Sequence, residues 1–435
     1  MNHKSITDPI AVQYGNQTLC FTIGSNHHLQ ASVWIEGFHS WMPLQLTGPG
    51  SSTPHAPRPL GNVRPVLING ALHCCYRDEN NHIQDLVHAG LLWSLVAVTG
   101  PGGAKGAPPA ASNPIPIQFG GYLHCFYRDF QGSIWDVFAV NGVWGVKQIT
   151  GPGSDAPQAA PAAGDLYVMT APRQIHIFYR GTDNHLWDAF GMVSFPWQAS
   201  KISNDILAGD PMTVPDCPYY FSDAYTTYHS MYTAYRTTSG QIKAVLFEGD
   251  KRREDDGTTM GKYEDAVLGS GRWKPYTLTS GGQTTAPSAA GDPCISKILK
   301  RGKSEWEGHV TIQYTDQQGN LVAITIHSYW PGDGLSAGEE FVNGLVSAAN
   351  LVRGGNTSAP FKGNSQMPQT QFYHTLACGP DGLFKTPALQ GKPCVVPLND
   401  STVLTFFRDV DNDVHSLYVK FNRSSGVPAA ALAVI

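Results

Sequence analysis

Residues 123–153 read LHCFYRDFQGSIWDVFAVNGVWGVKQITGPG, and this stretch contains three short strand patterns separated by turns. Leu123 to Arg128 and Ile134 to Ala139 alternate between apolar or aromatic and polar side chains, as half-buried strands do. Asp129 to Ser133 between them has the composition of a turn, and Asn141-Gly142 predicts a second tight turn. A third strand follows and ends at Gly-Pro-Gly, so the stretch predicts an antiparallel meander.

The same pattern recurs along the chain. A Tyr-Arg pair ends one strand of each unit, and the pairs are 51, 52 and 56 residues apart: Tyr76-Arg77, Tyr127-Arg128, Tyr179-Arg180 and Tyr235-Arg236. An aliphatic residue stands six positions after each Arg: Ile83, Ile134, Leu186 and Ile242. Five units carry a Trp six residues before a Thr or Ser: Trp41, Trp93, Trp144, Trp197 and Trp273. A period near 50 built of short strands is typical of a β-propeller, whose blades stack to bury both sheet faces.

We therefore predict an all-β protein, a single β-propeller domain over residues 1–435 with four-stranded blades. Seven hairpins favour seven blades, and six remain the alternative if one unit is an appendage. Residues 251–263, 296–308 and 361–392 interrupt the repeat and are expected to be insertions. The last of these is long and aromatic, which predicts a lid or plug. The seventh unit lacks a Trp strand, so the N-terminal segment or the final residues PAAALAVI are expected to close the ring.

Composition and charge argue against several classes of partner. The formal net charge is −5 and no long basic cluster occurs, so nucleic acid is not an expected partner. No apolar run has the length of a membrane span, and the first residues lack the apolar core of a signal peptide. Cys20, Cys74 and Cys125 share a repeat position with Ile177, so they are expected to be buried thiols. These features together predict a cytoplasmic protein.

The repeat resembles that of the fungal fucose-specific lectin family of β-propellers. The shared pattern is an aromatic strand, a Tyr-Arg pair, a turn, an Ile-x-acid strand and a Trp strand. The resemblance implies sugar pockets in which an Arg and a Glu grip vicinal hydroxyl groups beside an aromatic wall. The corresponding positions here hold Leu19 and Ala31, His73 and Asp85, His124 and Asp136, His176 and Asp188, Tyr232 and Ala244, Thr311 and Ala323, and Leu404 and Ser416. No unit keeps the Arg–Glu pair, which counts against a multivalent fucose lectin.

The chain also looks like a second branch of that family, the intracellular hetero-Diels–Alderases of tropolone sesquiterpenoid (meroterpenoid) biosynthesis. This resemblance implies a cycloaddition that joins an ortho-quinone methide tropolone or polyketide to a humulene-type terpene. We therefore expect a pericyclase that binds two hydrophobic small molecules and needs no cofactor and no metal; a homodimer remains open. A fucose- or glycan-binding lectin with altered pockets and a non-catalytic scaffold are the alternatives.

Candidate catalytic residues are side chains that can donate a hydrogen bond or a proton to the oxygen of a quinone methide: Tyr232, His229, His176 and Arg180. Candidate substrate-binding residues supply aromatic walls or polar anchors: Trp330, Tyr373, Trp187, Trp135, His124, Asp136 and Asp188. Each type has a structural alternative. The His and Asp residues can pair across a hairpin, the repeated Arg residues can bind loop carbonyls, and the aromatic rings can pack between blades. No metal-binding, triad or phosphate-binding motif is present in the sequence.

Overall fold

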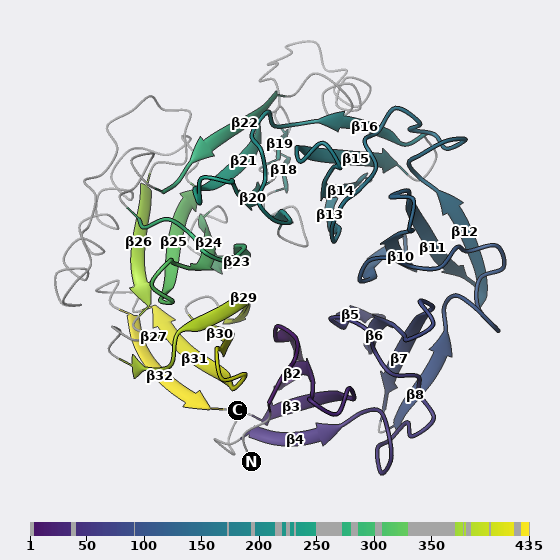
Figure 1. Ribbon diagram of the computed structural model, residues 1–435, viewed down its shortest axis with the longest axis horizontal. Coiled ribbons are helices and arrows are strands. Elements are labelled where there is room, and N and C mark those ends of the chain that lie inside the picture. Colours follow the sequence, from purple (N-terminus) through teal and green to yellow (C-terminus); the bar gives the residue numbers. More distant parts are fainter. Residues whose placement is uncertain are drawn as a thin grey trace.

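The chain folds as a β-propeller, which confirms the predicted all-β architecture. In this computed structural model the described residues are 4–35, 41–90, 92–171, 174–192, 196–213, 220–222, 227–229, 232–248, 272–279, 286–300, 307–328, 370–376, 378–379, 384–399, 402–421 and 428–434. Within them, seven four-stranded antiparallel sheets form a ring of blades around a central axis (Figure 1). The first strand of each blade lies nearest the axis and the fourth lies on the outer rim (Figure 1). The seven-bladed count is therefore confirmed over the six-bladed alternative.

The first four blades follow the chain without interruption. Blade 1 comprises β1 (Ile10–Tyr14), β2 (Gln17–Ile23), β3 (Leu29–Ile35) and β4 (Trp41–Gln45). Blade 2 comprises β5 (Arg64–Ile68), β6 (Ala71–Arg77), β7 (Ile83–Ala89) and β8 (Leu92–Ala97). Blade 3 comprises β9 (Ile115–Phe119), β10 (Tyr122–Arg128), β11 (Ile134–Val140) and β12 (Val143–Gln148). Blade 4 comprises β13 (Tyr167–Ala171), β14 (Gln174–Arg180), β15 (Leu186–Met192) and β16 (Gln198–Lys201).

The remaining blades carry small additions. Blade 5 comprises β17 (Met212–Thr213), β20 (Tyr232–Arg236), β21 (Ile242–Glu248) and β22 (Arg272–Thr277). Blade 6 comprises β23 (Cys294–Lys300), β24 (Glu307–Thr315), β25 (Leu321–Ser328) and β26 (Thr370–Leu376). Blade 7 comprises β29 (Leu389–Asn399), β30 (Thr402–Asp409), β31 (Val414–Phe421) and β32 (Pro428–Val434). Two small sheets stand apart: an antiparallel one of β18 (Tyr220–Ser222) and β19 (Thr227–His229), and a parallel one of β27 (Cys378–Gly379) and β28 (Phe384–Lys385).

The three strands predicted from residues 123–153 are β10, β11 and β12, within a residue or two at their ends. Asn141 and Gly142 both have positive φ, 52° and 78°, as a two-residue hairpin turn between twisted strands requires. In the other turn, Asp129 Oδ1 accepts hydrogen bonds from the backbone N–H groups of Gln131 and Ser133, each at 2.9 Å. The Asp129 side chain in one turn and the backbone of Asn141 and Gly142 in the other thus fix the register of the three strands.

The spacing of Trp and Thr in the repeat has a physical cause. Each Thr follows the fourth strand, where its hydroxyl accepts the N–H of the aliphatic residue that begins the third strand. In blade 3, Ile134 N donates to Thr150 Oγ1 at 2.9 Å, and the pairs Leu29–Thr47, Ile83–Thr99 and Ile242–Thr279 are built alike. Because these aliphatic residues are buried, an unsatisfied N–H there would be costly, so the hydroxyl is retained from blade to blade.

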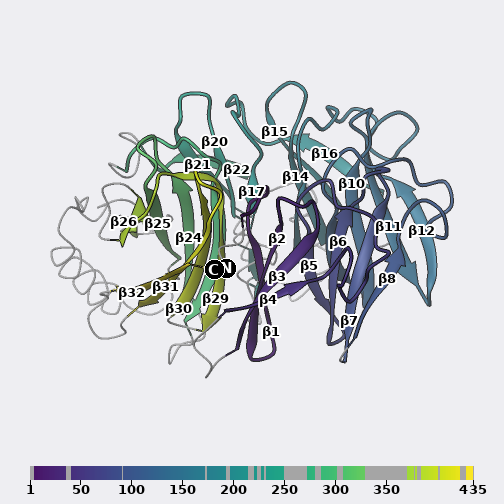
Figure 2. The same cartoon turned by 60° about the horizontal axis from the view of Figure 1, so that its bottom comes forward.

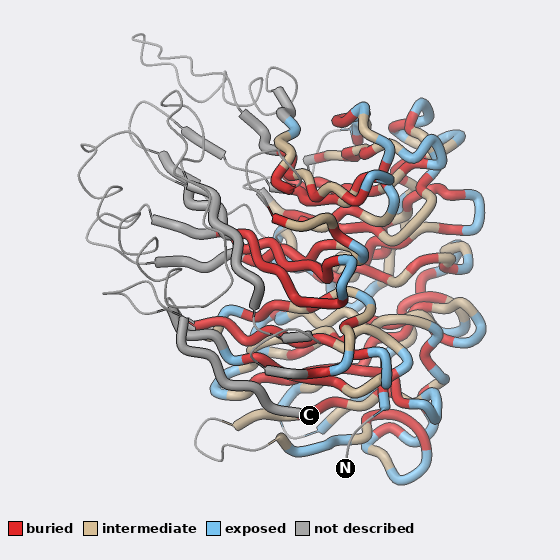
Figure 3. The backbone as a smooth tube through the Cα atoms, turned by 60° about the vertical axis from the view of Figure 1, so that its left-hand side comes forward, coloured by how far each residue is buried: buried red, intermediate tan, exposed pale blue. Residues whose placement is uncertain are grey.

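Apolar side chains fill the spaces between neighbouring blades. Cys125, Tyr127 and Val137 of blade 3, for example, pack with Cys75 and Val98 of blade 2. The predicted repeat thiols Cys20, Cys74 and Cys125 are buried and free, as expected. Of the repeat Trp residues, Trp197 is buried, whereas Trp41, Trp93 and Trp144 are partly buried against these clusters. Buried residues follow the strands and exposed residues gather in the turns (Figure 3).

The ring closes through both ends of the chain. β32 pairs with β31, so the C-terminal strand completes blade 7, as one of the two predicted routes required. Near the other end, Lys4 Nζ lies 2.9 Å from Asp413 Oδ2, and the backbones of these two residues form a bridge. Val396, Leu404 and Phe406 of blade 7 then pack with Cys20 of blade 1. The two ends of the chain meet at this junction (Figure 2).

Two expected insertions contribute to blade 6 instead. Of residues 296–308, residues 296–300 and 307–308 extend β23 and β24, with Ser296 paired to Thr311 and Lys300 to Glu307. Of residues 361–392, residues 370–376 form β26, the outer strand of the same blade, rather than part of a lid. Residues 370–376 lack the Trp that marks the fourth strand of other units, so only their pairing with β25 identifies them as a strand of blade 6. Residues 251–263 lie outside the described residues.

Candidate functional site

The three predicted His–Asp pairs form as expected. The distance between His Nδ1 and Asp Oδ2 is 2.7 Å for His73 and Asp85, and 2.9 Å for both His124–Asp136 and His176–Asp188. The strand register explains the contact. In blade 3, Phe126 is the partner of Asp136 and His124 is the partner of Phe138, so His124 and Asp136 are diagonal neighbours on one sheet face. Neighbouring strands therefore bring together residues that are twelve positions apart in sequence.

The three pairs differ in what the second ring nitrogen contacts. In blade 4, His176 Nε2 lies 3.2 Å from Gln174 Oε1, and the His176 side chain is only 3 % exposed. In blades 2 and 3, the His73 and His124 side chains are each 17 % exposed, and neither Nε2 has a hydrogen-bond partner among the described residues. A polar atom of an oriented imidazole is therefore accessible in blades 2 and 3, but not in blade 4.

Aromatic rings surround the blade 3 pair. The His124 ring stacks with Phe126 and Phe138 at centroid distances of 6.1 and 5.7 Å, and Phe119 meets its edge at 6.2 Å. On the same face, Phe126 packs edge-on against Trp197 of blade 4, with their centroids 6.0 Å apart. The accessible nitrogen of His124 thus belongs to a largely apolar environment at the junction of two blades.

Burial also affects the carboxylates of the pairs. Asp85, Asp136 and Asp188 are all buried. Burial raises the pKa of Asp136 above its ordinary value of 3.8, and the hydrogen bond and charge of His124 only partly oppose that effect. In blade 2, Asp85 Oδ1 also accepts the backbone N–H of Cys74 at 3.1 Å. These carboxylates are engaged with their own blade, which distinguishes them from a carboxylate presented to a ligand.

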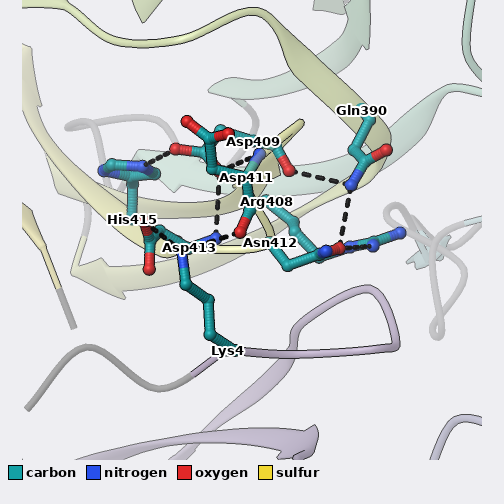
Figure 4. Close-up of polar contacts among 8 residues, drawn as sticks. All are labelled: Lys4, Gln390, Arg408, Asp409, Asp411, Asn412, Asp413 and His415. Carbon is teal, nitrogen blue, oxygen red and sulfur yellow. Dashed lines mark hydrogen bonds and ion pairs between the residues drawn. The ribbon is translucent and has the colours of Figure 1, made fainter. Parts of the chain in front are cut away.

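Trp135 and Trp187, the two residues predicted to form aromatic ligand walls, donate hydrogen bonds to Asp side chains of the preceding turns. Trp135 Nε1 donates to Asp129 Oδ2 at 2.8 Å, and Trp187 Nε1 lies 3.2 Å from both carboxylate oxygens of Asp183. Other blades fill this position with Gln84, which donates to Asp78 Oδ2, and with His415, whose Nε2 lies 2.7 Å from Asp409 Oδ2 (Figure 4). The sequence analysis did not recognise this contact, because the partners are four or six residues apart and their types vary.

Three of the repeated Arg residues link blades through Asp side chains, whereas the structural alternative predicted loop carbonyls as their acceptors. Arg180 Nη1 donates to Asn184 Oδ1 at 2.9 Å, and its Nε lies 3.6 Å from Asp210 Oδ1 at the start of blade 5. Two further pairs join blade 5 to blade 6 and blade 7 to blade 1: Arg236 with Asp292 at 3.1 Å, and Arg408 with Asp8 at 3.3 Å. Arg180, predicted to be catalytic, therefore has one donor bonded to Asn184 and its guanidinium paired with Asp210 of the next blade.

The other predicted site residues are placed only in part. Tyr232 begins β20 opposite Leu246, His229 ends β19 opposite Tyr220, and Tyr373 lies in β26 opposite Ile324. Trp330 lies outside the described residues. The roles assigned to these four residues stay predictions.

A repeat position missed in the sequence analysis surrounds the axis. Just before the innermost strand, six blades carry Asp or Asn, and we call these residues the Asx ring: Asp8, Asn62, Asn113, Asp165, Asp210 and Asp292. The side chains link neighbouring blades, since Asp165 Oδ1 accepts the N–H of Asn113 at 3.1 Å and Asp210 Oδ2 accepts the N–H of Asp165 at 3.0 Å. In blade 7 the position is occupied by Lys392.

Lys392 meets two other exceptions to the repeat. Two positions after the Asx ring, five blades carry Ile, Met or Cys, but blade 2 carries Arg64 and blade 4 carries Tyr167. The side chains of Arg64 and Lys392 both donate hydrogen bonds to the Tyr167 hydroxyl group, and we call these three residues the axis cluster. Aligning the repeats on the Asx position would have exposed all three substitutions in the sequence.

Comparisons with known proteins agree with the fold. No family model matches the chain, and no curated protein matches it. Domains 1–2 of the extracellular region of Drosophila Semaphorin 1a are similar with a TM-score of 0.50 at 10 % identity, over 97 % of this chain and 87 % of that chain. AofleA from Arthrobotrys oligospora gives a TM-score of 0.45 at 13 % identity, over 86 % of this chain and 85 % of that chain. A variant of the Aleuria aurantia lectin in complex with alpha-methyl-L-fucoside gives 0.44 at 12 % identity, over 77 % and 95 %.

The described residues contain no group of three or more His, Cys, Asp and Glu side chains arranged to hold a metal ion. No helix within them has the length and apolar character needed to cross a membrane.

Proposed function

We propose that this propeller is a pericyclase, a hetero-Diels–Alderase that joins an ortho-quinone methide to a humulene-type alkene. The observation that supports the proposal is the state of the positions where a fucose lectin would grip its sugar. In blade 3 they hold His124 and Asp136, which are bound to each other at 2.9 Å. The carboxylate is buried and its Oδ2 binds His124, so a ligand meets one imidazole nitrogen beside phenylalanine rings. One polar anchor in an apolar setting suits a hydrophobic molecule with a single reacting oxygen better than a polyhydroxylated sugar.

The proposed reaction requires little covalent chemistry from the protein. The four-atom oxadiene of the quinone methide and the alkene form one C–C and one C–O bond, with no atom lost and no electron donor or acceptor required. Holding both partners together offsets the entropy of a bimolecular step, which can lower the barrier by about 7 kcal/mol or more. A hydrogen bond to the quinone-methide oxygen stabilises the charge that develops there. In the preceding loss of water, an acid delivers a proton to the departing hydroxyl group.

The structure changes which residues we assign to these steps. Both ring nitrogens of His176 are bonded, to Asp188 and Gln174, so His176 has no donor for a ligand. Arg180 donates from Nη1 to Asn184 and its guanidinium is paired with Asp210, so we assign it to the link between blades 4 and 5. The donor role passes to His124 as an imidazolium, which donates Nδ1–H to Asp136 and Nε2–H to the ligand. Tyr232, His229, Tyr373 and Trp330 remain candidate substrate contacts. The proposal also includes a cytoplasmic location and catalysis without a cofactor.

The decisive experiment supplies purified protein with a quinone-methide precursor and humulenol, and measures product yield and enantiomeric excess. We expect faster formation of one enantiomer than in buffer. Racemic product at the uncatalysed rate would contradict the proposal. His124→Asn should lower the rate, whereas the matched variant His176→Asn should not lower it beyond its loss of folded protein. Equal rates for both variants would remove His124 from the mechanism and leave the enzyme proposal standing.

A sugar-binding function is the second candidate, favoured by one specific observation. The accessible Nε2 recurs in two successive blades, at His73 and His124, and repeated sites on one chain suit a multivalent lectin. Retention on a fucose column or signal on a glycan array would support this candidate, and silence on both would contradict it. A non-catalytic scaffold, the third reading of the sequence, would give neither product nor retention.

A further inference from the structure

Three innermost strands bring the axis cluster together. Arg64 begins β5 of blade 2, Tyr167 begins β13 of blade 4, and Lys392 lies in β29 of blade 7, all bordering the axis (Figure 1). Lys392 lies where the pairing of β29 with β30 shifts register between Gln390 and Cys394. A bulge of this kind re-aims side chains. The contact thus depends on three separate departures from the repeat.

Arg64 and Lys392 bind the same atom, the hydroxyl oxygen of Tyr167. Arg64 Nη2 donates to the Tyr167 hydroxyl oxygen at 3.1 Å, and Lys392 Nζ donates to it at 2.8 Å. The ammonium also lies 4.1 Å from the centroid of the Tyr167 ring, and the guanidinium carbon lies 5.2 Å from it. Because the phenolic oxygen accepts two hydrogen bonds, its own proton remains available to donate to a third group. Three kinds of donor therefore converge: guanidinium, ammonium and phenol.

Carboxylates of the Asx ring lie near these donors, and the charge of Lys392 opposes the effect of burial, which raises the pKa of Asp210. Asp165 Oδ2 lies 3.9 Å from Arg64 Nη2, but it also accepts a hydrogen bond from Asn113 Nδ2 at 2.7 Å. Among the described residues, Lys392 has no carboxylate within ion-pair distance, and the buried Nε of Arg64 has no acceptor. Tyr167 is 7 % exposed and the Arg64 side chain 13 %, so the cluster is poorly hydrated but not sealed.

Nearby thiols do not supply the missing charge. Burial raises the pKa of Cys294, and it raises the pKa of Cys394 to about 12, so both remain neutral. Burial lowers the pKa of Lys392, but the interaction with Tyr167 outweighs it, and the pKa is raised above its ordinary value. Lys392 therefore stays a cation. Two like charges that share one acceptor make a poor structural cross-link, whereas they suit an anion that binds between them.

We propose that Arg64, Tyr167 and Lys392 form a binding site for a small planar organic oxyanion, such as a carboxylate or the ionised hydroxy-ketone of a tropolone. A planar pair of oxygens can bridge the guanidinium and the ammonium while the Tyr167 hydroxyl donates to one of them. This inference does not rest on the proposed cycloaddition. If both hold, the site positions the acidic oxygen of one substrate.

Calorimetric titration of the full chain tests the site with three probes: benzoate, tropolonate and uncharged tropone. We expect saturable binding of benzoate and tropolonate, with tropone at least tenfold weaker. Lys392→Met and Arg64→Gln should each weaken tropolonate binding at least tenfold. The control Lys147→Met removes an exposed cation from the outer strand of blade 3, 2.7 Å from Asp155, and should bind like the wild type. Equal affinities for all variants would overturn the proposal, as would the absence of saturable binding to the wild type.

Stability without ligand separates a binding site from a structural cross-link. A site held for binding predicts that Lys392→Met melts at or above the wild-type temperature, because the variant removes a buried cation that lacks a counter-ion. A structural cross-link predicts a clear loss of stability, which would overturn the proposal. Tyr167→Phe keeps the ring and removes the shared acceptor, so it should lower tropolonate affinity without unfolding the blade. Inorganic phosphate that binds more tightly than benzoate would contradict the planar-oxyanion assignment.

Discussion

Blades 3 and 4 contain the same His–Asp pair, but only one of the two pairs is open to a ligand. Their second strands, YLHCFYR in β10 and QIHIFYR in β14, begin with Tyr122 and Gln174, two residues before the His. Gln174 Oε1 reaches His176 Nε2, whereas Tyr122 is exposed and leaves His124 Nε2 accessible. A single strand position thus separates an internally satisfied pair from one that can act on another molecule.

The largest expected effect is the loss of stability on breaking the internally satisfied pair of His176 and Asp188. Asp188→Ala leaves the His176 ring nitrogen buried without its acceptor, and should cost about 3 kcal/mol of stability. Asp136→Ala should cost about half as much, because the partly exposed His124 can turn toward water. Chemical denaturation of both variants measures the difference. Equal costs would show that the two blades do not differ as described.

Substitutions at Tyr122 and Gln174, which begin β10 and β14, should reverse which of His124 and His176 has an accessible Nε2. Gln174→Ala should cost about 1 kcal/mol and expose His176 Nε2 to modification by diethyl pyrocarbonate. Tyr122→Gln should slow the modification of His124. Mass spectrometry of each histidine over time measures both rates. Unchanged reactivity in both variants would mean that the first strand residue does not control access.

The turn contacts allow a smaller comparison between the same blades. Trp135→Phe removes a 2.8 Å hydrogen bond to Asp129 and should cost about 1 kcal/mol. Trp187→Phe removes a longer bond of 3.2 Å to an exposed Asp183 and should cost about half of that or less. Thermal melting of the two variants provides the test, and an equal or reversed order would contradict the assigned role of Trp135.

The smallest effects are changes in pH dependence, with opposite signs at two carboxylates. The raised pKa of Asp136 means that its contribution to stability is full below pH 3.8 and is lost as the pH rises through the folded-state value. Asp136→Asn should therefore gain stability relative to the wild type as the pH rises above 3.8.

Asp205 is the matched control. Burial raises its pKa, but hydrogen bonds from Lys243 and Tyr235 outweigh burial and hold it below 3.8. Its contribution is present above that value and is lost as the pH falls through the folded-state pKa. Asp205→Asn should cost stability above pH 3.8, and the cost should shrink on acidification. Unfolding curves over this range that give the same sign for both variants would contradict one of the two assignments.

Much of the candidate site could be predicted because its contacts lie within one hairpin. The pairing of His124 with Asp136 followed from strand spacing, since the turn at Asp129 sets the register of β10 and β11. The role of Trp135 could not be read in the same way. A Trp beside a carboxylate on a strand has the same sequence pattern whether it faces a ligand or binds the preceding turn.

Contacts between strands that are distant in sequence escaped prediction for a different reason. Residues 370–376 lack the Trp of a fourth strand, and only their pairing with β25 identifies them as one. The meeting of Arg64, Tyr167 and Lys392 depends on three blades that face one axis. No local spacing encodes that meeting.

The sequence by itself determined the repeat, the propeller class and the pairing of His with Asp, because hairpin turns and alternating strands act over a few residues. Only the tertiary structure decided which imidazole is accessible and which charged side chains share the axis. Both depend on how far side chains reach across and between sheets. The closure of the ring, rather than any one segment, sets those distances.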